Sequence, residues 1–302
     1  MNDAVAHIEL RNAKKRYGHV TVLDCDSFDV LPGEVHVLAG ENGAGKSTLI
    51  KILGGAITEY EGELRLGGEA VAWKSPHDAS ARGVAVIHQE LSLVPSMSVV
   101  DNLYLGDLPV RRGFVRQGAM RRQAREALRK VGLQLPLDEL VERLPIATQQ
   151  LVEVAKALRR EARVVVMDEP TSALNVREAE RLFALIQELK SQGCGVVYIT
   201  HKMDEIERLA DRITVLRDGK RVATEAGSEV GADRLIRLMV GDKGLRPTEA
   251  APRTPPGETV LAVEGLTVHR HGREVARDVS LSVRKGEVVG LAGLEGSGNS
   301  AV

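Results

Sequence analysis

The chain has 302 residues, of which 43% are hydrophobic and 27% are charged, and its net charge at pH 7 is −1. These values are ordinary for a globular protein and exclude a largely disordered chain. A net charge near zero and an aromatic content of 3% do not favour binding to nucleic acid. The two cysteines suggest neither a disulfide framework nor a zinc site. No apolar run approaches the roughly 18 residues of a membrane-spanning helix, so any membrane role must be peripheral.

Short apolar runs rich in β-branched residues recur along the chain, separated by helical segments. They lie at 35–39, 84–87, 164–167, 195–199 and 213–216. Such runs are typical of buried parallel strands. From about residue 91 to residue 162 the pattern is mostly helical, with breaks at prolines. The sequence therefore predicts an α/β domain that has a mostly parallel sheet and a helical subdomain inserted at about 91–162.

The first predicted strand, 35–39, leads into a glycine-rich loop and then a predicted helix from Lys46. The loop matches the phosphate-binding pattern of two glycines five residues apart followed by Lys and Ser. Its glycines let backbone N–H groups face phosphates, and the helix adds its positive end. Lys46 would contact the β- and γ-phosphates, and the Ser47 hydroxyl would ligate Mg²⁺. The predicted phosphate-binding residues are Gly40, Glu41, Asn42, Gly43, Ala44, Gly45, Lys46, Ser47 and Thr48.

Polar residues also follow two later predicted strands. Asp168 and Glu169 come directly after the run at 164–167. Ligands of open α/β sheets bind at the carboxyl ends of the strands. Asp168 could therefore hold Mg²⁺, and Glu169 could act as general base on the attacking water. His201 follows the run at 195–199, from where it could reach the γ-phosphate.

The sequence contains an internal repeat. The stretch 33–40, GEVHVLAG, returns 253 residues later as GEVVGLAG at 286–293, a period too long for a solenoid. Residues 244–258 between the copies are rich in Pro, Gly and Thr, as in an extended linker. We therefore expect a first domain over 1–243, a linker over 244–258, and the start of a second copy over 259–302. Because that copy stops within its motif, we expect the chain to be truncated inside the second domain.

These residues together resemble the ATP-binding cassette (ABC) proteins. The resemblance is specifically to the ATP-binding subunits of bacterial monosaccharide importers of the ribose, xylose and galactose type. Tyr17 stands where the family stacks an aromatic ring on adenine, Gln89 matches its glutamine loop, and His201 matches its switch histidine. The stretch 93–106 looks like the segment after the glutamine loop in the sugar-importer branch. Residues 171–174 match the loop that meets the opposite domain.

The resemblance implies a RecA-like P-loop NTPase fold and an ATPase that uses ATP and Mg²⁺. It assigns catalysis to Lys46, Gln89, Glu169 and His201, and Mg²⁺ binding to Ser47, Gln89 and Asp168. Two cassettes, the second in the same chain or in another copy, would close head to tail. Each ATP would then lie between the phosphate loop of one cassette and a signature segment of the other.

The resemblance also implies the partners and the location of the protein. Closure of the cassettes would drive two membrane permease subunits, which receive sugar from a binding protein outside the inner membrane. The subunit would then work peripherally on the cytoplasmic face of that membrane, with no nucleic acid as partner.

Two segments depart from the family pattern. The signature segment, 144–150, has Pro145 in place of a serine hydroxyl and Ala147 in place of a closely approaching glycine. The second phosphate loop, 293–300, has Asn299 in place of lysine, and His271 stands at the position equivalent to Tyr17. In a head-to-tail pair these segments meet, so one composite site is weakened on both sides. We therefore expect the other site, with Lys46, to turn over most ATP.

Two other functions remain open. One is a soluble tandem cassette protein that acts on ribosomes or DNA without a permease. The short, Pro-rich linker and the near-zero net charge disfavour it. The other is a regulatory module that binds nucleotide without hydrolysis. The presence of Lys46, Asp168, Glu169 and His201 disfavours this module, whereas Pro145 and Ala147 favour it.

Overall fold

The computed structural model describes residues 5–89, 91–111, 113–159, 162–241, 257–270, 273–293, 297–298 and 301–302. The chain divides into two compact units, Met1–Leu245 and Arg246–Val302. The first unit contains the first predicted phosphate loop and all the candidate catalytic and Mg²⁺-binding residues. None of the described helices is both long enough and apolar enough to cross a membrane.

The described part of the first unit alternates strands and helices. Its strands are β1 (Ile8–Tyr17), β2 (Val20–Val30), β3 (Val35–Ala39), β4 (Glu61–Leu66), β5 (Glu69–Val71), β6 (Val84–Ile87), β7 (Val110–Arg111), β8 (Phe114–Val115), β9 (Val164–Asp168), β10 (Gly195–Ile199), β11 (Arg212–Arg217) and β12 (Lys220–Ala226). Its helices are α1 (Lys46–Leu53), α2 (Pro76–Ala81), α3 (Val99–Leu103), α4 (Gln117–Lys130), α5 (Ile146–Leu158), α6 (Val176–Ser191), α7 (Met203–Leu209) and α8 (Ala232–Val240), with single 3₁₀ turns at Val141–Arg143 and Gly227–Glu229.

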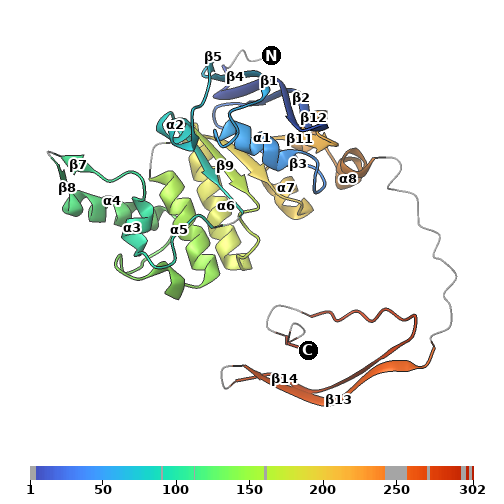
Figure 1. Ribbon diagram of the computed structural model, residues 1–302. Coiled ribbons are helices and arrows are strands. Elements are labelled where there is room, and N and C mark those ends of the chain that lie inside the picture. Colours follow the sequence, from blue (N-terminus) through green and yellow to red (C-terminus); the bar gives the residue numbers. More distant parts are fainter. Residues whose placement is uncertain are drawn as a thin grey trace. The chain divides into compact units, whose positions relative to one another are not determined.

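A mostly parallel central sheet forms the middle of this unit, as predicted (Figure 1). Its strand order within the described residues is β12-β11-β3-β10-β9-β6. Only β12, at one edge, pairs antiparallel with its neighbour, β11; the other pairs are parallel. Along β9, Val165 and Met167 belong to one apolar core, whereas Val164 and Val166 belong to the other. The sheet is therefore covered on both faces, which explains why its strands are continuous apolar runs.

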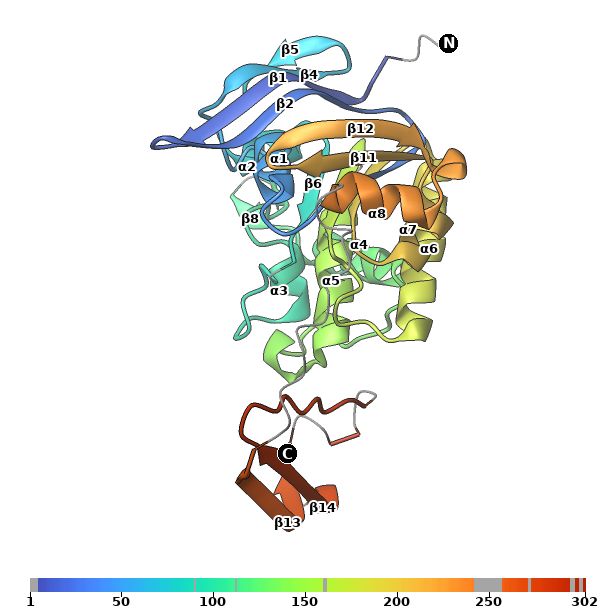
Figure 2. The same ribbon diagram turned by 90° about the vertical axis from the view of Figure 1, so that its right-hand side faces the viewer.

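A second, antiparallel sheet covers helix α1. Its strand order is β2-β1-β4-β5 in the described residues, and Figure 2 shows it as a layer beside α1. Leu49 and Ile52 of α1 share one core with Ile8 and Leu10 of β1 and with Val166 of the central sheet. Because α1 is packed between the two sheets, its first turn is held at the end of β3.

The region between β6 and β9 consists mainly of helices α3, α4 and α5, which pack on one another (Figure 1). Met120 and Ala124 of α4 and Val152 of α5 are buried in the same core as Tyr104. The short hairpin β7–β8 also belongs to this region. The helical pattern of the sequence did not indicate this hairpin, because strands of two residues are too short to show a period.

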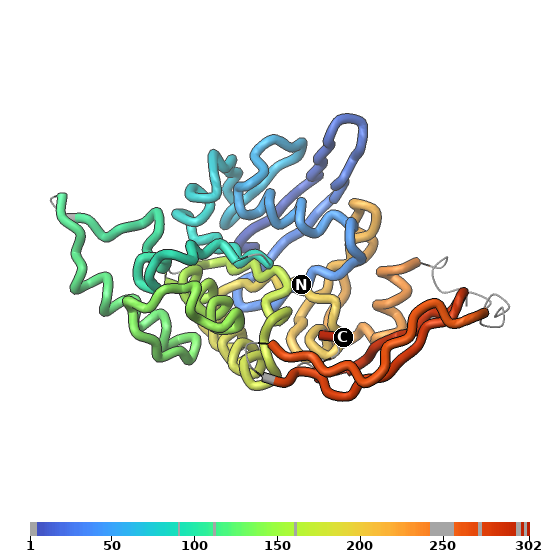
Figure 3. The backbone as a smooth tube through the Cα atoms, turned by 60° about the horizontal axis from the view of Figure 1, so that its bottom comes forward, coloured from blue at the N-terminus to red at the C-terminus, as the bar shows by residue number. Residues whose placement is uncertain are grey.

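The described part of the second unit is dominated by a long antiparallel hairpin, β13 (Thr259–Arg270) and β14 (Arg273–Arg284), shown in Figure 3. Like β1 and β2, these strands lead to a glycine with left-handed backbone: Gly33 has φ 66° and Gly286 has φ 81°. We propose that 259–302 begins a second copy of the first domain. His271 and Asn299, as well as most of the predicted linker 244–258, lie outside the described residues.

Candidate nucleotide-binding site

The predicted phosphate loop lies at the carboxyl end of β3, pressed against neighbouring strands. Gly40, Gly43 and Gly45 have φ values of 152°, 83° and 100°, which side chains other than glycine rarely allow. A Cβ added at Gly40 would lie 2.3 Å from the carbonyl oxygen of Leu216 in β11. One added at Gly45 would lie 2.9 Å from the carbonyl oxygen of Val22 in β2. The glycines are therefore required both for the curl of the loop and for its close approach to the strands behind it.

Lys46 begins helix α1 and folds back over the loop. Its Nζ donates to the carbonyl oxygens of Gly40 and Glu41, at 2.7 and 2.9 Å. Burial lowers the pKa of Lys46, although the charges of Glu169 and Asp168 act in the opposite direction. Ser47 and Thr48 follow in the first turn of α1, where backbone N–H groups are free to bind an anion. The loop thus combines an ammonium group and a helix N-terminus, a combination that suits phosphate.

Glu169 joins two other candidate residues in one cluster. Its Oε2 accepts a hydrogen bond from Gln89 Nε2 at 3.2 Å, and its Oε1 lies 3.1 Å from His201 Nδ1. Gln89, Glu169 and His201 follow β6, β9 and β10, whose parallel strands end at the same edge of the sheet. Glu169 itself has φ 46°, an uncommon value for a residue other than glycine. The structure therefore brings together three residues that the sequence placed only at separate strand ends.

Asp168 is the last residue of β9, and its surroundings disfavour the charged form of its carboxylate. Burial and the neighbouring charge of Glu169 raise the pKa of Asp168, and His88, Lys46 and Lys51 only partly offset this. A cation close to the carboxylate would relieve that charge. The oxygen atoms offered by Ser47, Gln89 and Asp168 are of the kind that Mg²⁺ prefers. The residues present could therefore hold Mg²⁺ at this edge.

Tyr17 is the last residue of β1 and pairs with Val20 of β2, the strand against which the phosphate loop packs at Gly45. Its side chain is 55% exposed, and Lys15 Nζ lies 5.3 Å from the centre of its ring. An exposed aromatic ring can stack on a flat base. Tyr17 is therefore free to receive an adenine, although no contact joins it to Glu169 or Lys46 in the described residues.

The predicted signature segment opens helix α5 in the helical region. Pro145 is the residue before the first turn of α5, and the neighbouring Ile146 is 64% exposed. Pro145 brings neither a hydroxyl nor a backbone N–H to this exposed helix start. Gln149 of the same helix turns back and donates to the carbonyl oxygen of Leu144 at 2.9 Å. The segment therefore lies at a helix N-terminus, but Pro145 offers an anion neither a hydroxyl group nor an N–H group there.

Two buried carboxylates near the site were missed by sequence reasoning. Glu153 of α5 accepts hydrogen bonds from Ser92 N–H at 3.2 Å and from Ser92 Oγ at 2.5 Å, which ties α5 to the loop after Gln89. Glu205 of α7 accepts a hydrogen bond from Thr200, directly before His201. Glu153 stands in a mostly buried stretch of α5, and Glu205 stands in the first turn of α7, where acidic residues are common. No local sequence signal distinguished them.

The fold and the site define a P-loop ATPase domain of the ABC type. A nucleotide-free ATP-binding cassette from an ABC transporter aligns with 80% of this chain and 98% of its own, at a TM-score of 0.66 and 24% identity. A dimeric post-hydrolysis ATP-binding cassette bound to ADP and Pi aligns with 72% of this chain and 98% of its own, at a TM-score of 0.65 and 25% identity.

Sequence comparisons agree with this class. The family model described as ABC transporter matches residues 23–172. Ribose import ATP-binding protein RbsA 2 of Rubrobacter xylanophilus is 53% identical over 297 residues, 96% of this chain and 56% of the relative. A putative ribose/galactose/methyl galactoside import ATP-binding protein of Rhizobium meliloti is 46% identical over 292 residues, again 96% and 56%. Residues 23–172 thus form an ABC transporter ATPase domain, and the chain spans about half the length of these curated relatives.

Proposed function

We propose that this chain is part of the ATP-hydrolysing subunit that energises import of a monosaccharide through an ABC transporter. The observation that carries the proposal is the cluster in which Gln89 and His201 each contact the carboxylate of Glu169. Relatives named for import of ribose or galactose, at 46 to 53% identity over 96% of the chain, support a monosaccharide as the cargo.

The phosphates of ATP bind to the loop from Gly40 to Thr48 in this proposal. The packing of Gly40 and Gly45 against neighbouring strands supports it, because the backbone is already curled. Tyr17 stacks on the adenine. Mg²⁺, held by Ser47, Gln89 and Asp168, would neutralise phosphate charge when bound.

Glu169 is the general base of the proposed hydrolysis. It accepts a proton from the water that attacks the γ-phosphorus, the bond to the β-phosphate oxygen breaks, and ADP and phosphate leave. Gln89 and His201 contact different oxygens of this carboxylate and so restrict its rotation. Lys46 offers its ammonium group to the phosphate oxygens, in place of the loop carbonyls that it contacts now.

The proposed partners are those of the whole importer. They are the membrane permease subunits, a second cassette in the same chain or in another copy, and, indirectly, an extracytoplasmic sugar-binding protein. The subunit would then work peripherally at the cytoplasmic face of the inner membrane. Pro145 at the start of α5 favours one other candidate, a domain that binds nucleotide but does not hydrolyse it.

Reconstitution with permease subunits in liposomes tests the proposed function. We expect the intact protein to co-purify with the permease and to support uptake of ribose or galactose that requires both ATP and the sugar-binding protein. Phosphate should be released in step with uptake. A protein that binds ATP but releases no phosphate would support the regulatory candidate. Phosphate release without any associated permease would support a soluble tandem ATPase instead.

A further inference from the structure

A buried carboxylate joins the loops that carry Glu169 and His201. Glu205 of α7 is only 4% exposed. Among the described residues, four groups donate to it, two to each oxygen. Thr171 Oγ1 and Lys202 Nζ reach Oε1 at 2.6 and 3.2 Å. Tyr198 Oη and Thr200 Oγ1 reach Oε2 at 2.9 and 2.8 Å.

These donors come from two loops, one that carries Glu169 and one that carries His201, which we call the catalytic loops. Thr171 lies two residues beyond Glu169, whereas Thr200 and Lys202 stand on either side of His201. Thr200 Oγ1 also accepts a hydrogen bond from the N–H of Lys202, at 3.1 Å. Lys202 Nζ reaches Thr171 Oγ1 directly, also at 3.1 Å. The relative position of the two loops therefore depends on contacts that meet at the carboxylate of Glu205.

The chemistry of this cluster requires a charged acceptor. Burial would raise the pKa of Glu205, but the hydrogen bonds from Thr171, Thr200, Tyr198 and Lys202 outweigh it and lower the pKa. Glu205 is therefore ionised at neutral pH. An amide in its place would turn one of the two acceptor oxygens into a donor facing groups that already donate. The hydroxyl groups would have to turn away, and the loops would lose their shared anchor.

We propose that Glu205 is a positioning residue for ATP hydrolysis, which fixes the spacing between Glu169 and His201 without touching the substrate. This inference rests on the proposed ATPase function. Glu169 Oε1 and His201 Nδ1 lie 3.1 Å apart, and a displacement of about 1 Å in a catalytic group can lower a rate by about a hundredfold. The hydrogen bonds to Glu205 come from residues after β9 and at β10, and none comes from the phosphate loop, so we expect nucleotide binding to be retained when Glu205 is changed.

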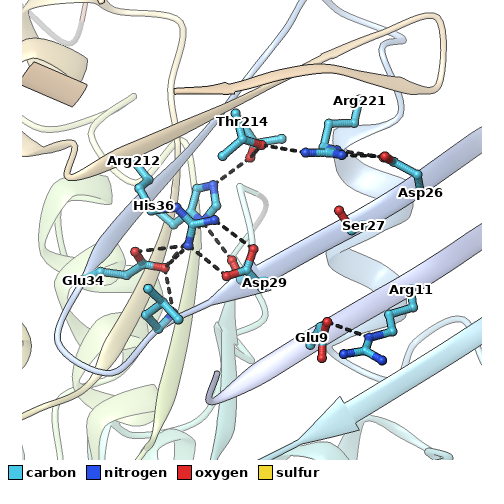
Figure 4. Close-up of polar contacts among 12 residues, drawn as sticks. Glu9, Arg11, Asp26, Ser27, Asp29, Glu34, His36, Arg212, Thr214 and Arg221 are labelled. Atoms are coloured by element: carbon cyan, nitrogen blue, oxygen red, sulfur yellow. Dashed lines mark hydrogen bonds and ion pairs between the residues drawn. The ribbon is translucent and has the colours of Figure 1, made fainter. Parts of the chain in front are cut away.

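The substitution Glu205→Gln tests this role, with Glu34→Gln as the matched control. Glu34 is similarly buried, at 6% exposed, and also accepts hydrogen bonds, from Leu31 N–H and Arg212. Figure 4 shows it beside Arg212 and Asp29, in the turn that precedes β3. It therefore lies at the opposite end of β3 from the phosphate loop. Both variants lose one charged acceptor, but only one of them touches the catalytic loops.

We expect Glu205→Gln to lower kcat for ATP about tenfold to a hundredfold, with KM and nucleotide affinity unchanged. Glu34→Gln should lower the melting temperature and leave kcat at the wild-type value. Addition of Thr171→Val to Glu205→Gln should cause little further loss, because the two residues act through the same contact. Should Glu205→Gln fail to fold, Thr171→Val alone removes one donor and should lower kcat with KM unchanged.

The outcomes separate this inference from the function on which it rests. If the wild-type protein releases no phosphate, the proposed ATPase function fails. If the wild-type protein is active and folded Glu205→Gln or Thr171→Val matches its kcat, Glu205 has no positioning role. A rise in KM that accounts for the whole loss would also contradict the inference, since it would indicate a defect in binding.

Discussion

Glu169 holds a backbone conformation that residues other than glycine seldom adopt, with φ 46°. For such residues the left-handed region costs about 1 to 2 kcal/mol, and it persists where other contacts hold it. Here the N–H of Glu169 donates to the carbonyl oxygen of Ile199 at 3.1 Å, and its carboxylate meets Gln89 and His201. Asn12, Asp218 and Asp278 share this backbone conformation, but of the four only Glu169 contacts Gln89 and His201.

Lys46→Ala tests how much the side chain of this lysine contributes to the binding of ATP by the phosphate loop. A hydrogen bond to a charged group contributes about 1.5 to 3 kcal/mol. We therefore expect the Kd for ATP to rise about tenfold to a hundredfold in the variant, as measured by calorimetry. Lys130→Ala, which changes an exposed residue at the end of helix α4, should bind as wild type. An unchanged Kd in Lys46→Ala would show that this lysine does not contact the nucleotide.

Glu169 and His201 could be predicted because each follows an apolar strand, Lys46 because it belongs to the glycine-rich loop, and Gln89 from the family resemblance. Lys46, Gln89, Glu169 and His201 stand just beyond runs that parallel pairing brings to one edge, so strand order was not needed to group them. Glu205 could not be predicted in this way. An acidic residue in the first turn of a helix is ordinary, because it complements the helix dipole. Its role arises only from the packing of α7 against two loops.

At the scale of elements, an ion-pair network centred on Arg212 connects β2 to the central sheet. Arg212 of β11 donates to both carboxylate oxygens of Asp29 in β2, at 2.8 and 2.9 Å, and to Glu34 at 3.2 Å (Figure 4). His36, fully buried on β3, hydrogen-bonds to Thr214 of β11 at 2.7 Å. This network lies at the amino end of β3, so it supports the sheet rather than the site.

The network predicts a stability that depends on pH. Burial would raise the pKa of Asp29, but the hydrogen bond and charge of Arg212 more than offset this and lower it. The pKa of Asp29 is thus lower in the folded chain than in the unfolded one. Its contribution to stability is therefore present above the unfolded value, about 3.9, and is lost as pH falls through the folded value.

Arg212→Ala tests this contribution. Because both groups are partly exposed to solvent, we expect a loss of about 1 to 3 kcal/mol at pH 7, less than for a fully buried pair. The difference from wild type should shrink as the pH falls below about 4. Arg221→Ala breaks a more exposed pair with Asp26 and should cost about 1 kcal/mol or less. Urea unfolding at several pH values measures both, and equal losses in the two variants would contradict the prediction.

The elements were predictable to different degrees. The buried strands were visible as apolar runs because both faces of the central sheet are covered, and α1 was visible from the loop that precedes it. The hairpin β7–β8 was not visible, because strands of two residues each show no apolar period and are too short to be recognised. Strand order also depends on contacts between distant segments, which local patterns do not contain.

At the scale of the whole molecule, the two halves of the repeat are unequal. The first phosphate loop has Lys46, whereas the second has Asn299, and the first signature segment has Pro145. In a head-to-tail pair the weakened loop and the weakened signature belong to the same composite site. We propose that the site with Lys46 and Glu169 turns over most of the ATP that drives transport.

The most direct test is phosphate release by the intact protein with its permease subunits, compared between wild type, Glu169→Gln and Asn299→Lys. We expect Glu169→Gln to bind ATP normally but to lose at least about a hundredfold in kcat, because its general base is gone. Asn299→Lys should change kcat by less than about twofold, because the composite site to which Asn299 belongs would still be weakened by Pro145 in its signature segment. Substantial phosphate release that survives Glu169→Gln would contradict both the assigned base and the inequality of the two sites.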